Sequence, residues 1–263
     1  MHESIYIAAS AGLKQGRKMD MVAQNLANVN NTGYKRTGLV FKEMMPPFPP
    51  DSGLEAGRNV LLPPHKSNKH TSYVGVTDSY TDYTAGLFKE TGGTLDLALH
   101  GEGFFKVQTS EGPRYTRNGN FRLSPENQLV NQNGNQVLDQ DNQPVVIDAP
   151  GADINIDGEG NISAGTGLVN IPIGNIKMVR FENNKSLEKA GDGLFLQNDS
   201  TAIEQLPEGT TMQQGFLENS NVSAVEEMTE MIGTVRMFET YQKMIQSIDS
   251  MDDQSVNTIG RVG

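Results

Sequence analysis

The chain has 263 residues, a net charge of −11 and 36% hydrophobic residues, enough for one or two domains with a core. It contains no cysteine, which excludes disulfide frameworks, thiolate metal sites and cysteine nucleophiles. The acidic excess disfavours nucleic acid and anionic lipid as partners. No segment approaches the roughly 20 apolar residues of a membrane span, so no membrane insertion is expected.

A helix is predicted near the amino terminus, because no proline occurs from Ile5 to Val29. Apolar or small residues alternate at intervals of four and three positions, which predicts one contact face with heptad spacing: Ile5, Ala9, Gly12, Gly16, Met19, Ala23 and Leu26. The helix is expected to end within residues 28–33, where Asn and Gly tolerate a left-handed backbone. The opening segment lacks the basic lead of a secretory signal, so no cleaved signal peptide is expected.

Prolines cluster at residues 46–50 and 63–64 and exclude ladder strands there. We therefore predict an extended Pro-rich connector over residues 37–74. Residues 75–217 instead contain short apolar runs separated by turns at roughly 8–12-residue spacing, which is typical of an all-β sandwich or barrel-like domain. The clearest hairpin signals are Asn118-Gly119 and Asn133-Gly134.

A second long helix is predicted after Ser223, whose spacing to Glu226 is that of a capping box. Its apolar stripe recurs every three or four residues: Val225, Met228, Ile232, Val235, Phe238, Tyr241, Ile245 and Ile248. Residues 1–36 hold five basic and two acidic residues, net +3, whereas residues 218–263 hold three basic and eight acidic residues, net −5. Opposite charge and apolar stripes favour pairing, either with each other or with neighbouring copies. The sequence leaves both arrangements open.

These elements predict an α+β fold. The long N- and C-terminal helices, with residues 1–36 and 218–263, are expected to pair in a coiled-coil-like bundle as one helical domain. The connector of residues 37–74 would lead to the β-rich outer domain of residues 75–217.

No motif for chemistry is complete. Asp153, Asn155 and Asp157 match the first half of a calcium-binding loop, but Ala164 stands where the closing Glu is required. Carboxylates such as Asp96 and Glu102 are more typical of a solvated acidic surface than of an acid–base pair. We therefore predict no catalytic residue, no cofactor or metal site, and no small-molecule substrate. The chain is not expected to be an enzyme.

Four segments resemble the flagellar rod and hook proteins. The first pairs Asn25, Leu26, Ala27, Asn28 and Val29 with the turn Thr32, Gly33, Tyr34 and Lys35. A second joins Leu217 and Glu218 to Ser220, Asn221 and Val222. The runs from Leu95 to Phe105 and from Tyr115 to Phe121 are similar to β-domain motifs of the family. The resemblance covers nearly the whole chain in order.

The resemblance implies a structural subunit of the axial drive shaft. In that family the terminal helices of many copies pack inside a hollow shaft and the β domain lies outside. The partners implied are other copies, neighbouring rod proteins and the flagellar type III export apparatus, and the implied location is the periplasmic rod of the basal body. Asp82, Gly86 and Thr91-Gly92, with the ending Val256 to Arg261, resemble the proximal-rod members most, followed by the distal-rod members. A β-domain binding module with an intrachain helical hairpin is the alternative from another class.

Overall fold

The computed structural model describes residues 2–44, 73–148, 152–165, 170–198, 203–207 and 209–259. The chain divides into two compact units. Unit 1 comprises Met1–Leu26, Thr37–Tyr80 and Ala224–Gly263. Unit 2 comprises Ala27–Arg36 and Thr81–Ser223. Unit 1 therefore combines both ends of the chain with residues 37–80, and unit 2 combines residues 27–36 with the rest of the centre.

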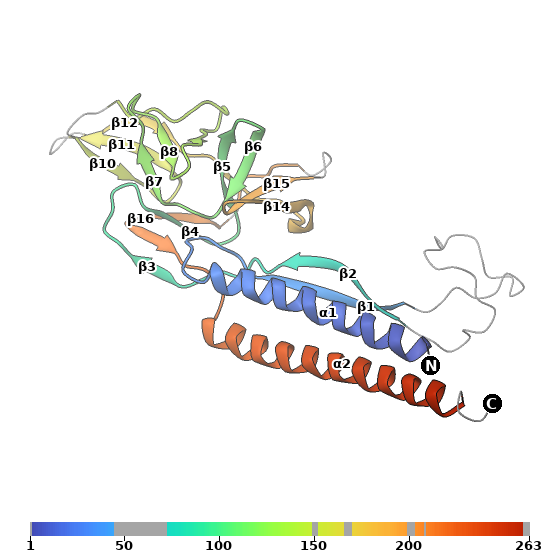
Figure 1. Ribbon diagram of the computed structural model, residues 1–263. Coiled ribbons are helices and arrows are strands. Elements are labelled where there is room, and N and C mark those ends of the chain that lie inside the picture. The colour runs from blue at the N-terminus through green and yellow to red at the C-terminus, as the bar shows by residue number, and fades with distance from the viewer. Residues whose placement is uncertain are drawn as a thin grey trace, which may run out of the picture. The chain divides into compact units, whose positions relative to one another are not determined.

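The fold is α+β, with a helix at each end and a mostly β centre, as predicted (Figure 1). The helices are α1 (His2–Ala27) and α2 (Ala224–Ile259). The first strands are β1 (Thr37–Met44), β2 (Tyr73–Thr81), β3 (Phe88–Glu90), β4 (Leu97–His100), β5 (Phe104–Thr109), β6 (Gly112–Thr116), β7 (Phe121–Leu123), β8 (Leu129–Asn131) and β9 (Gln136–Val137). The remaining elements are β10 (Asp153–Ile156), β11 (Asn161–Gly165), β12 (Asn170–Asn175), β13 (Met178–Val179), the short helix η2 (Asn184–Ser186), β14 (Leu187–Gly191), β15 (Leu194–Gln197), β16 (Thr211–Gln214) and β17 (Phe216–Glu218).

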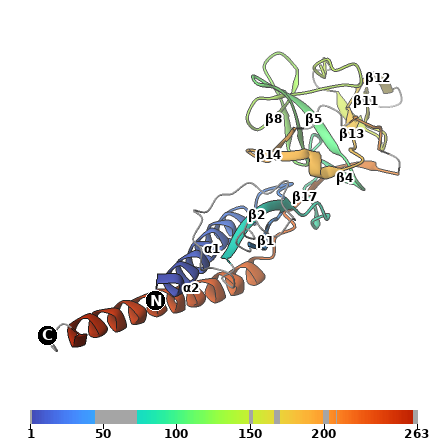
Figure 2. The same ribbon diagram turned by 90° about the vertical axis from the view of Figure 1, so that its right-hand side faces the viewer.

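Unit 1 contains the two long helices, which lie side by side and antiparallel (Figures 1 and 2). Lys18 Nζ lies 2.9 Å from Glu230 Oε1. Further towards the N-terminus of α1, Gly12 faces Tyr241, whose Cβ would be 4.0 Å from a methyl group at the glycine. The small residue therefore lets the two backbones approach, whereas the predicted coiled-coil geometry itself stays a prediction.

Unit 1 also contains a two-stranded sheet formed by β1 and β2. These strands occupy the two ends of the segment for which we predicted an extended connector. The proline clusters at residues 46–50 and 63–64 lie outside the described residues, so the Pro-rich connector remains a prediction.

Unit 2 is built from antiparallel strands around one main apolar core. Its largest sheet has the order β14-β15-β6-β5-β9-β8-β7, with β13 added beside β5. A three-stranded sheet, β10-β11-β12, and the pairs β16-β4 and β17-β3 complete it. Leu97, Phe105, Leu129 and Ile162 are fully buried in the core that these strands share. The last strands of the unit, β16 and β17, pair with its first two, which ties both ends of this β region together.

The two predicted hairpins have different outcomes. Asn133-Gly134 does connect the paired strands β8 and β9, and Gly134 has a φ of +84°. The Asn118-Gly119 prediction was wrong, because β6 pairs with β5 and β15, and β7 pairs with β8. Gly119 is instead required by close packing, since a Cβ there would lie 1.7 Å from the carbonyl oxygen of Leu97.

Among the described residues of unit 2, the same five-residue turn occurs four times, at residues 124–128, 131–135, 139–143 and 157–161. In each, the first residue donates its N–H to the fifth carbonyl, and the fourth donates to the first. A side-chain oxygen of the first residue accepts from the third and fifth N–H groups. The fourth residue has a positive φ, which Gly and Asn tolerate: Asn127, Gly134, Asn142 and Gly160. This repeat places Ser, Asn or Asp at each first position.

Candidate functional site

The predicted contact face of α1 is mostly covered. Gly12 is buried, and five others are half-buried: Ile5, Ala9, Gly16, Met19 and Leu26. Ala23 is exposed, whereas the neighbouring Val22 is fully buried. The covered face is therefore turned slightly from the predicted seam towards Ala8 and Val22, both of which are 2% exposed or less.

The covered face of α2 has strict heptad spacing. Its members are all buried or half-buried: Glu227, Met231, Thr234, Phe238, Tyr241, Ile245, Ile248 and Asp252. This set includes the last four residues of the predicted stripe, and Val235 beside it is half-buried. The first three residues of the predicted stripe, Val225, Met228 and Ile232, are instead 75%, 52% and 55% exposed.

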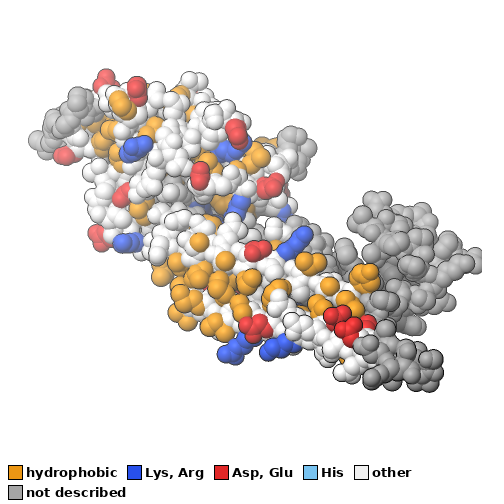
Figure 3. Space-filling model, in the orientation of Figure 1, with side chains coloured by type: hydrophobic (Ala, Val, Ile, Leu, Met, Phe, Trp, Pro, Cys, Tyr) orange, Lys and Arg blue, Asp and Glu red, His pale blue; other side chains and the backbone are white. Residues whose placement is uncertain are grey.

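Exposed apolar residues therefore lie on both flanks of the covered face of α2. With a heptad repeat, Val225, Met228 and Ile232 fall on one side of that face. Three methionines, Met237, Met244 and Met251, repeat every seven residues on the other side and are 46–49% exposed. Opposite the covered face runs an exposed polar column: Thr229, Arg236, Lys243 and Ser250. Figure 3 shows hydrophobic side chains gathered on unit 1 where α1 and α2 lie.

Asn25 joins both helices of unit 1 to the first strand. Its side-chain Nδ2 donates to the Thr37 carbonyl at 2.9 Å, and its Oδ1 accepts from the Thr37 N–H at 3.0 Å. Nδ2 also lies 3.4 Å from Oε2 of Glu227 on α2. Asn25 and Glu227 are almost completely buried. The side-chain amide of Asn25 carries a donor and an acceptor in one plane, so it can bond both the C=O and the N–H of Thr37.

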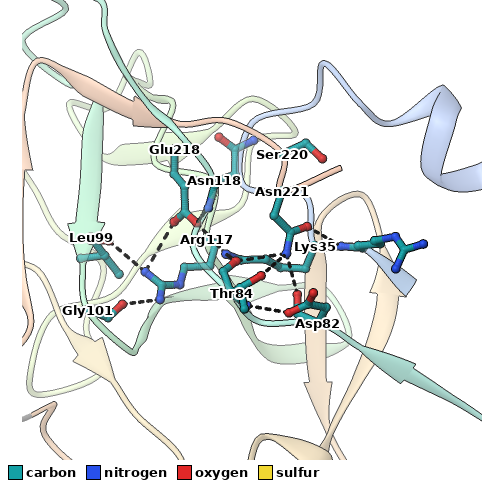
Figure 4. A network of polar contacts seen from close by, with 12 residues as sticks. Lys35, Asp82, Thr84, Leu99, Gly101, Arg117, Asn118, Glu218, Ser220 and Asn221 are labelled. Carbon is teal, nitrogen blue, oxygen red and sulfur yellow. Dashed lines mark hydrogen bonds and ion pairs between the residues drawn. The ribbon is translucent and has the colours of Figure 1, made fainter. Parts of the chain in front are cut away.

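In unit 2, three buried charges meet at a point that we call the ionic junction: Lys35, Arg117 and Glu218 (Figure 4). Lys35 Nζ lies 2.6 Å from Glu218 Oε1 and also donates to the Thr84 carbonyl at 2.7 Å. Arg117 Nη1 lies 3.5 Å from Glu218 Oε2. The Lys35 and Glu218 side chains are 1% and 0% exposed. Segments distant in the sequence therefore share one buried ion network.

The charges of the ionic junction are compensated by backbone groups as well as by each other. Arg117 donates to the carbonyls of Leu99 and Gly101. Glu218 Oε1 accepts from the Gly86 N–H at 3.0 Å. Burial lowers the pKa of Lys35, and the neighbouring Glu218 carboxylate opposes that shift. Glu218 is the carboxylate that contacts both cations, and its charge attracts each of them more strongly than Asp82 attracts Lys35 or Glu102 attracts Arg117.

Two of the segments that resemble rod and hook proteins, residues 32–35 and 217–222, surround the ionic junction. Asn221 accepts from the Arg36 N–H at 2.7 Å and donates to the carbonyls of Asp82 and Thr84. Gly33 donates its N–H to the Glu218 carbonyl at 2.7 Å. Gly33 has a φ of +69°, and a Cβ there would lie 2.5 Å from the Asn118 nitrogen. A larger residue would therefore displace the turn from the junction.

Other residues of the motifs that resemble rod and hook proteins lie in or beside the turn that contains Gly33, or in the segment before α2. Asn28 accepts from the Asn31 side chain at 2.6 Å. It directly follows α1, which ends at Ala27, one residue before the predicted range of 28–33. Tyr34 is buried beneath the Lys189 ammonium, which lies 4.2 Å from its ring centre. Val222 is buried, and its N–H donates to the Ser220 hydroxyl. Of the rest, Leu26 and Thr32 are half-buried, and Ala27 is exposed.

Glu218 and Arg117 lie within the motifs that resemble the family, but the sequence predicted no role for either of them. Each is a single charged residue in an otherwise ordinary strand or loop, and nothing nearby in the sequence marks it as buried. Their one sequence signal is position, because Glu218 directly precedes the Ser220-Asn221-Val222 segment and Arg117 lies inside the Tyr115–Phe121 motif.

The carboxylates considered for chemistry have structural contacts. Asp157 accepts two hydrogen bonds from Asn161 and one from the Glu159 N–H, and the Asn161 side chain leads in lowering the pKa of Asp157. Asp96 accepts from the Thr91 hydroxyl, and Glu102 pairs with Arg180. Within the described ranges, no three His, Asp or Glu side chains are grouped to hold a metal ion. No helix of the described part is long and apolar enough to cross a membrane.

Comparison with known proteins gives matches in three regions. Residues 5–35 match the flagella basal body rod protein family, residues 98–164 the flagellar hook protein FlgE/F/G D1 domain, and residues 213–259 the flagellar basal body rod FlgEFG protein C-terminal family. The flagellar basal-body rod protein FlgF of Caulobacter vibrioides is 32% identical over 262 residues, covering 100% of both chains. The chain belongs to the flagellar basal-body rod protein family.

Other rod proteins are similarly close. The flagellar basal-body rod protein FlgG of Bacillus subtilis is 33% identical over 98% of this chain and 99% of its own. FlgF of Mesorhizobium japonicum is 28% identical over 99% of both chains. The first and last matched regions, 5–35 and 213–259, contain Lys35 and Glu218. The ionic junction of this rod protein therefore joins the two terminal regions by which the family is recognised.

Proposed function

We propose that this chain is a structural subunit of the flagellar rod that assembles through α1 and α2 with other copies and with neighbouring rod proteins. The observation that carries the proposal is the pair of exposed apolar flanks on α2. Membership of the rod family across the full chain supports it.

An ordinary helical hairpin buries one stripe and exposes polar residues elsewhere. On α2, the column opposite the covered face is polar, but Ile232 on one flank and Met244 on the other remain exposed. Exposed apolar side chains that line up along an element are typical of interaction surfaces. A helix with apolar residues on both sides of its covered face fits neighbours on both sides, as packing around a tube requires.

The charges of unit 1 fit the same arrangement. Lys18 and Glu230 pair within the chain. Arg17 on α1, and Glu239 and Asp249 on α2, are exposed. Opposite charges on the two helices favour contacts between the basic helix of one copy and the acidic helix of the next.

The proximal-rod position, that of FlgF, is the one we favour. Its support is the full-length match to the Caulobacter FlgF and the Asp82, Gly86 and Thr91-Gly92 pattern. FlgG is the second candidate, because the Bacillus FlgG is as similar in identity. We further propose export through the flagellar type III apparatus without cleavage, and a place in the periplasmic part of the basal body.

The assembly proposal is tested by Ile232→Asp, with Thr229→Asp as the matched control. Thr229 lies one turn earlier, on the polar column, so it receives the same charge outside both apolar flanks. Since Ile232 is 55% exposed, we expect monomer stability to change by no more than about 0.5 kcal/mol. Ile232→Asp should be lost from purified basal bodies while Thr229→Asp is retained. Normal incorporation of Ile232→Asp would contradict the proposal and favour the intrachain hairpin of a binding module.

The position in the rod is tested by electron microscopy of basal bodies from a deletion strain. For a proximal subunit, we expect a base without distal rod, hook or filament. A rod that stops only beyond its proximal part would assign the chain to the distal rod. Intact flagella would contradict the rod assignment altogether.

A further inference from the structure

We propose that Asn133 is a site of spontaneous deamidation in the folded protein and that Asn118 is not. The sequence contains two Asn-Gly pairs, and each is followed by asparagine: Asn118-Gly119-Asn120 and Asn133-Gly134-Asn135. In a flexible chain, the residue that follows an asparagine largely sets its deamidation rate. That residue is glycine at both sites, so a difference in deamidation between them must come from the fold.

The reaction needs access of a backbone nitrogen to a side-chain carbonyl. The nitrogen of the following glycine, after loss of its proton to water, attacks Cγ of the asparagine and forms a five-membered succinimide. The Cγ–Nδ2 bond breaks, and the nitrogen leaves as ammonia. Water then opens the ring at Cγ to give aspartate, or at the main-chain carbonyl to give isoaspartate. No oxidant or reductant is required.

Asn133 is free to adopt that geometry. It lies at the exposed tip of the β8–β9 hairpin, and no hydrogen bond involves its side-chain amide among the described residues. Gly134 is also exposed, and nothing lies within 4 Å of where its Cβ would be. The Gly134 N–H does donate to the Asn131 carbonyl at 3.0 Å. That single turn bond must open for attack, which exposed hairpin tips do readily.

Asn118 is held on both sides of the reacting bond. Its Oδ1 accepts from the Asn120 N–H at 3.0 Å, and its own N–H donates to the Thr116 hydroxyl. Gly119 is buried against Leu97, whose N–H donates to the Gly119 carbonyl at 3.0 Å. Rotation of this backbone would drive it into the Leu97 carbonyl, so succinimide formation requires the core to open.

The product at residue 133 has a local structural effect. Asn131 Oδ1 accepts from the N–H groups of Asn133 and Asn135. Isoaspartate adds a methylene to the main chain between them, which breaks the spacing on which this turn depends. Aspartate keeps the spacing and adds a negative charge near Arg122, whose guanidinium lies 3.4 Å from the Gln132 carbonyl.

The test is peptide mapping by mass spectrometry of the full-length protein after incubation at mildly alkaline pH, folded and in urea. In urea, both asparagines should deamidate at similar rates. In the folded protein, Asn133 should convert while Asn118 stays intact, and Asn133→Gln should abolish the reaction in that peptide. Equal protection of both sites in the folded protein, or faster conversion of Asn118, would overturn the proposal.

Discussion

Replacing Glu218 by glutamine should be the most damaging single change to the ionic junction. Glu218→Gln keeps the side-chain shape and an acceptor for the Gly86 N–H, but it removes the carboxylate that contacts both Lys35 and Arg117. These two buried cations then keep only the weaker electrostatic attraction of Asp82 and Glu102. Removing one member of a buried ion pair typically costs about 3–5 kcal/mol. Loss of the Lys35 proton sets an upper bound on the cost of burying this residue without its partner. From an ordinary pKa of about 10.4, deprotonation at pH 7 costs about 4.6 kcal/mol, at about 1.36 kcal/mol per pKa unit.

Lys35→Met is the matched control because it removes the opposite charge from the same pair. Glu218 then keeps Arg117 at 3.5 Å, so one cation still faces one anion. The Thr84 carbonyl loses the lysine but keeps the Asn221 amide at 3.1 Å. We expect a loss of about 1–3 kcal/mol, smaller than that of Glu218→Gln.

The assay is urea denaturation of the full-length variants, followed by circular dichroism at several pH values. If Lys35 is neutral in folded Glu218→Gln, the unfolded chain binds one more proton, so this variant must gain stability as pH rises towards about 10. Its deficit relative to the unmodified chain should therefore shrink between pH 7 and pH 10. A loss below about 1 kcal/mol, or a larger loss for Lys35→Met, would refute the idea that Glu218 holds two cations.

Three further predictions concern other buried contacts. Asn25→Ala should cost about 2–4 kcal/mol in urea denaturation, because the buried N–H and C=O groups of Thr37 lose their partners. Gly119→Ala should cost about 1–3 kcal/mol or more through overlap with backbone, whereas Gly134→Ala should cost about 1–2 kcal/mol for its left-handed φ alone; equal thermal shifts would contradict this. Burial lowers the pKa of Lys189 to about 8, so the unfolded chain binds more protons between about pH 8 and 10.5. The unmodified chain should gain stability over that range relative to Lys189→Met, and parallel pH profiles would contradict the shift.

The helices and the β centre were predictable because both depend on local periodicity. The 3–4 spacing of apolar residues marks α1 and α2, and Ser223 marks the start of α2. The identity of the covered face was less predictable. Its heptad in α2 includes Glu227 and Thr234, which a pattern of apolar residues passes over, while the more apolar Val225 and Ile232 lie outside it. A helix that has several contact faces spreads its apolar residues among them.

The ionic junction could not have been predicted from local patterns. Lys35 and Glu218 are 183 residues apart, and charged side chains are normally assigned to the surface. Asn118-Gly119 shows the same limit for turns. This dipeptide fits a hairpin turn locally, but in the fold Gly119 lies where the backbone passes too close to Leu97 for any side chain. In both cases long-range packing decided the role of a residue whose local meaning was different.

The position of the ionic junction along the chain suggests why buried charges are used there. The segment that follows α1 and the segment that precedes α2 both belong to unit 2, and Lys35 and Asn221 lie on them. In the rod subunit proposed above, these two segments must keep one register under load. Apolar contacts tolerate small slips, whereas a buried ion pair with fixed partners loses several kcal/mol when either partner moves away. We therefore expect variants of the ionic junction to weaken load transmission before they prevent assembly, because the apolar flanks of α2 remain intact.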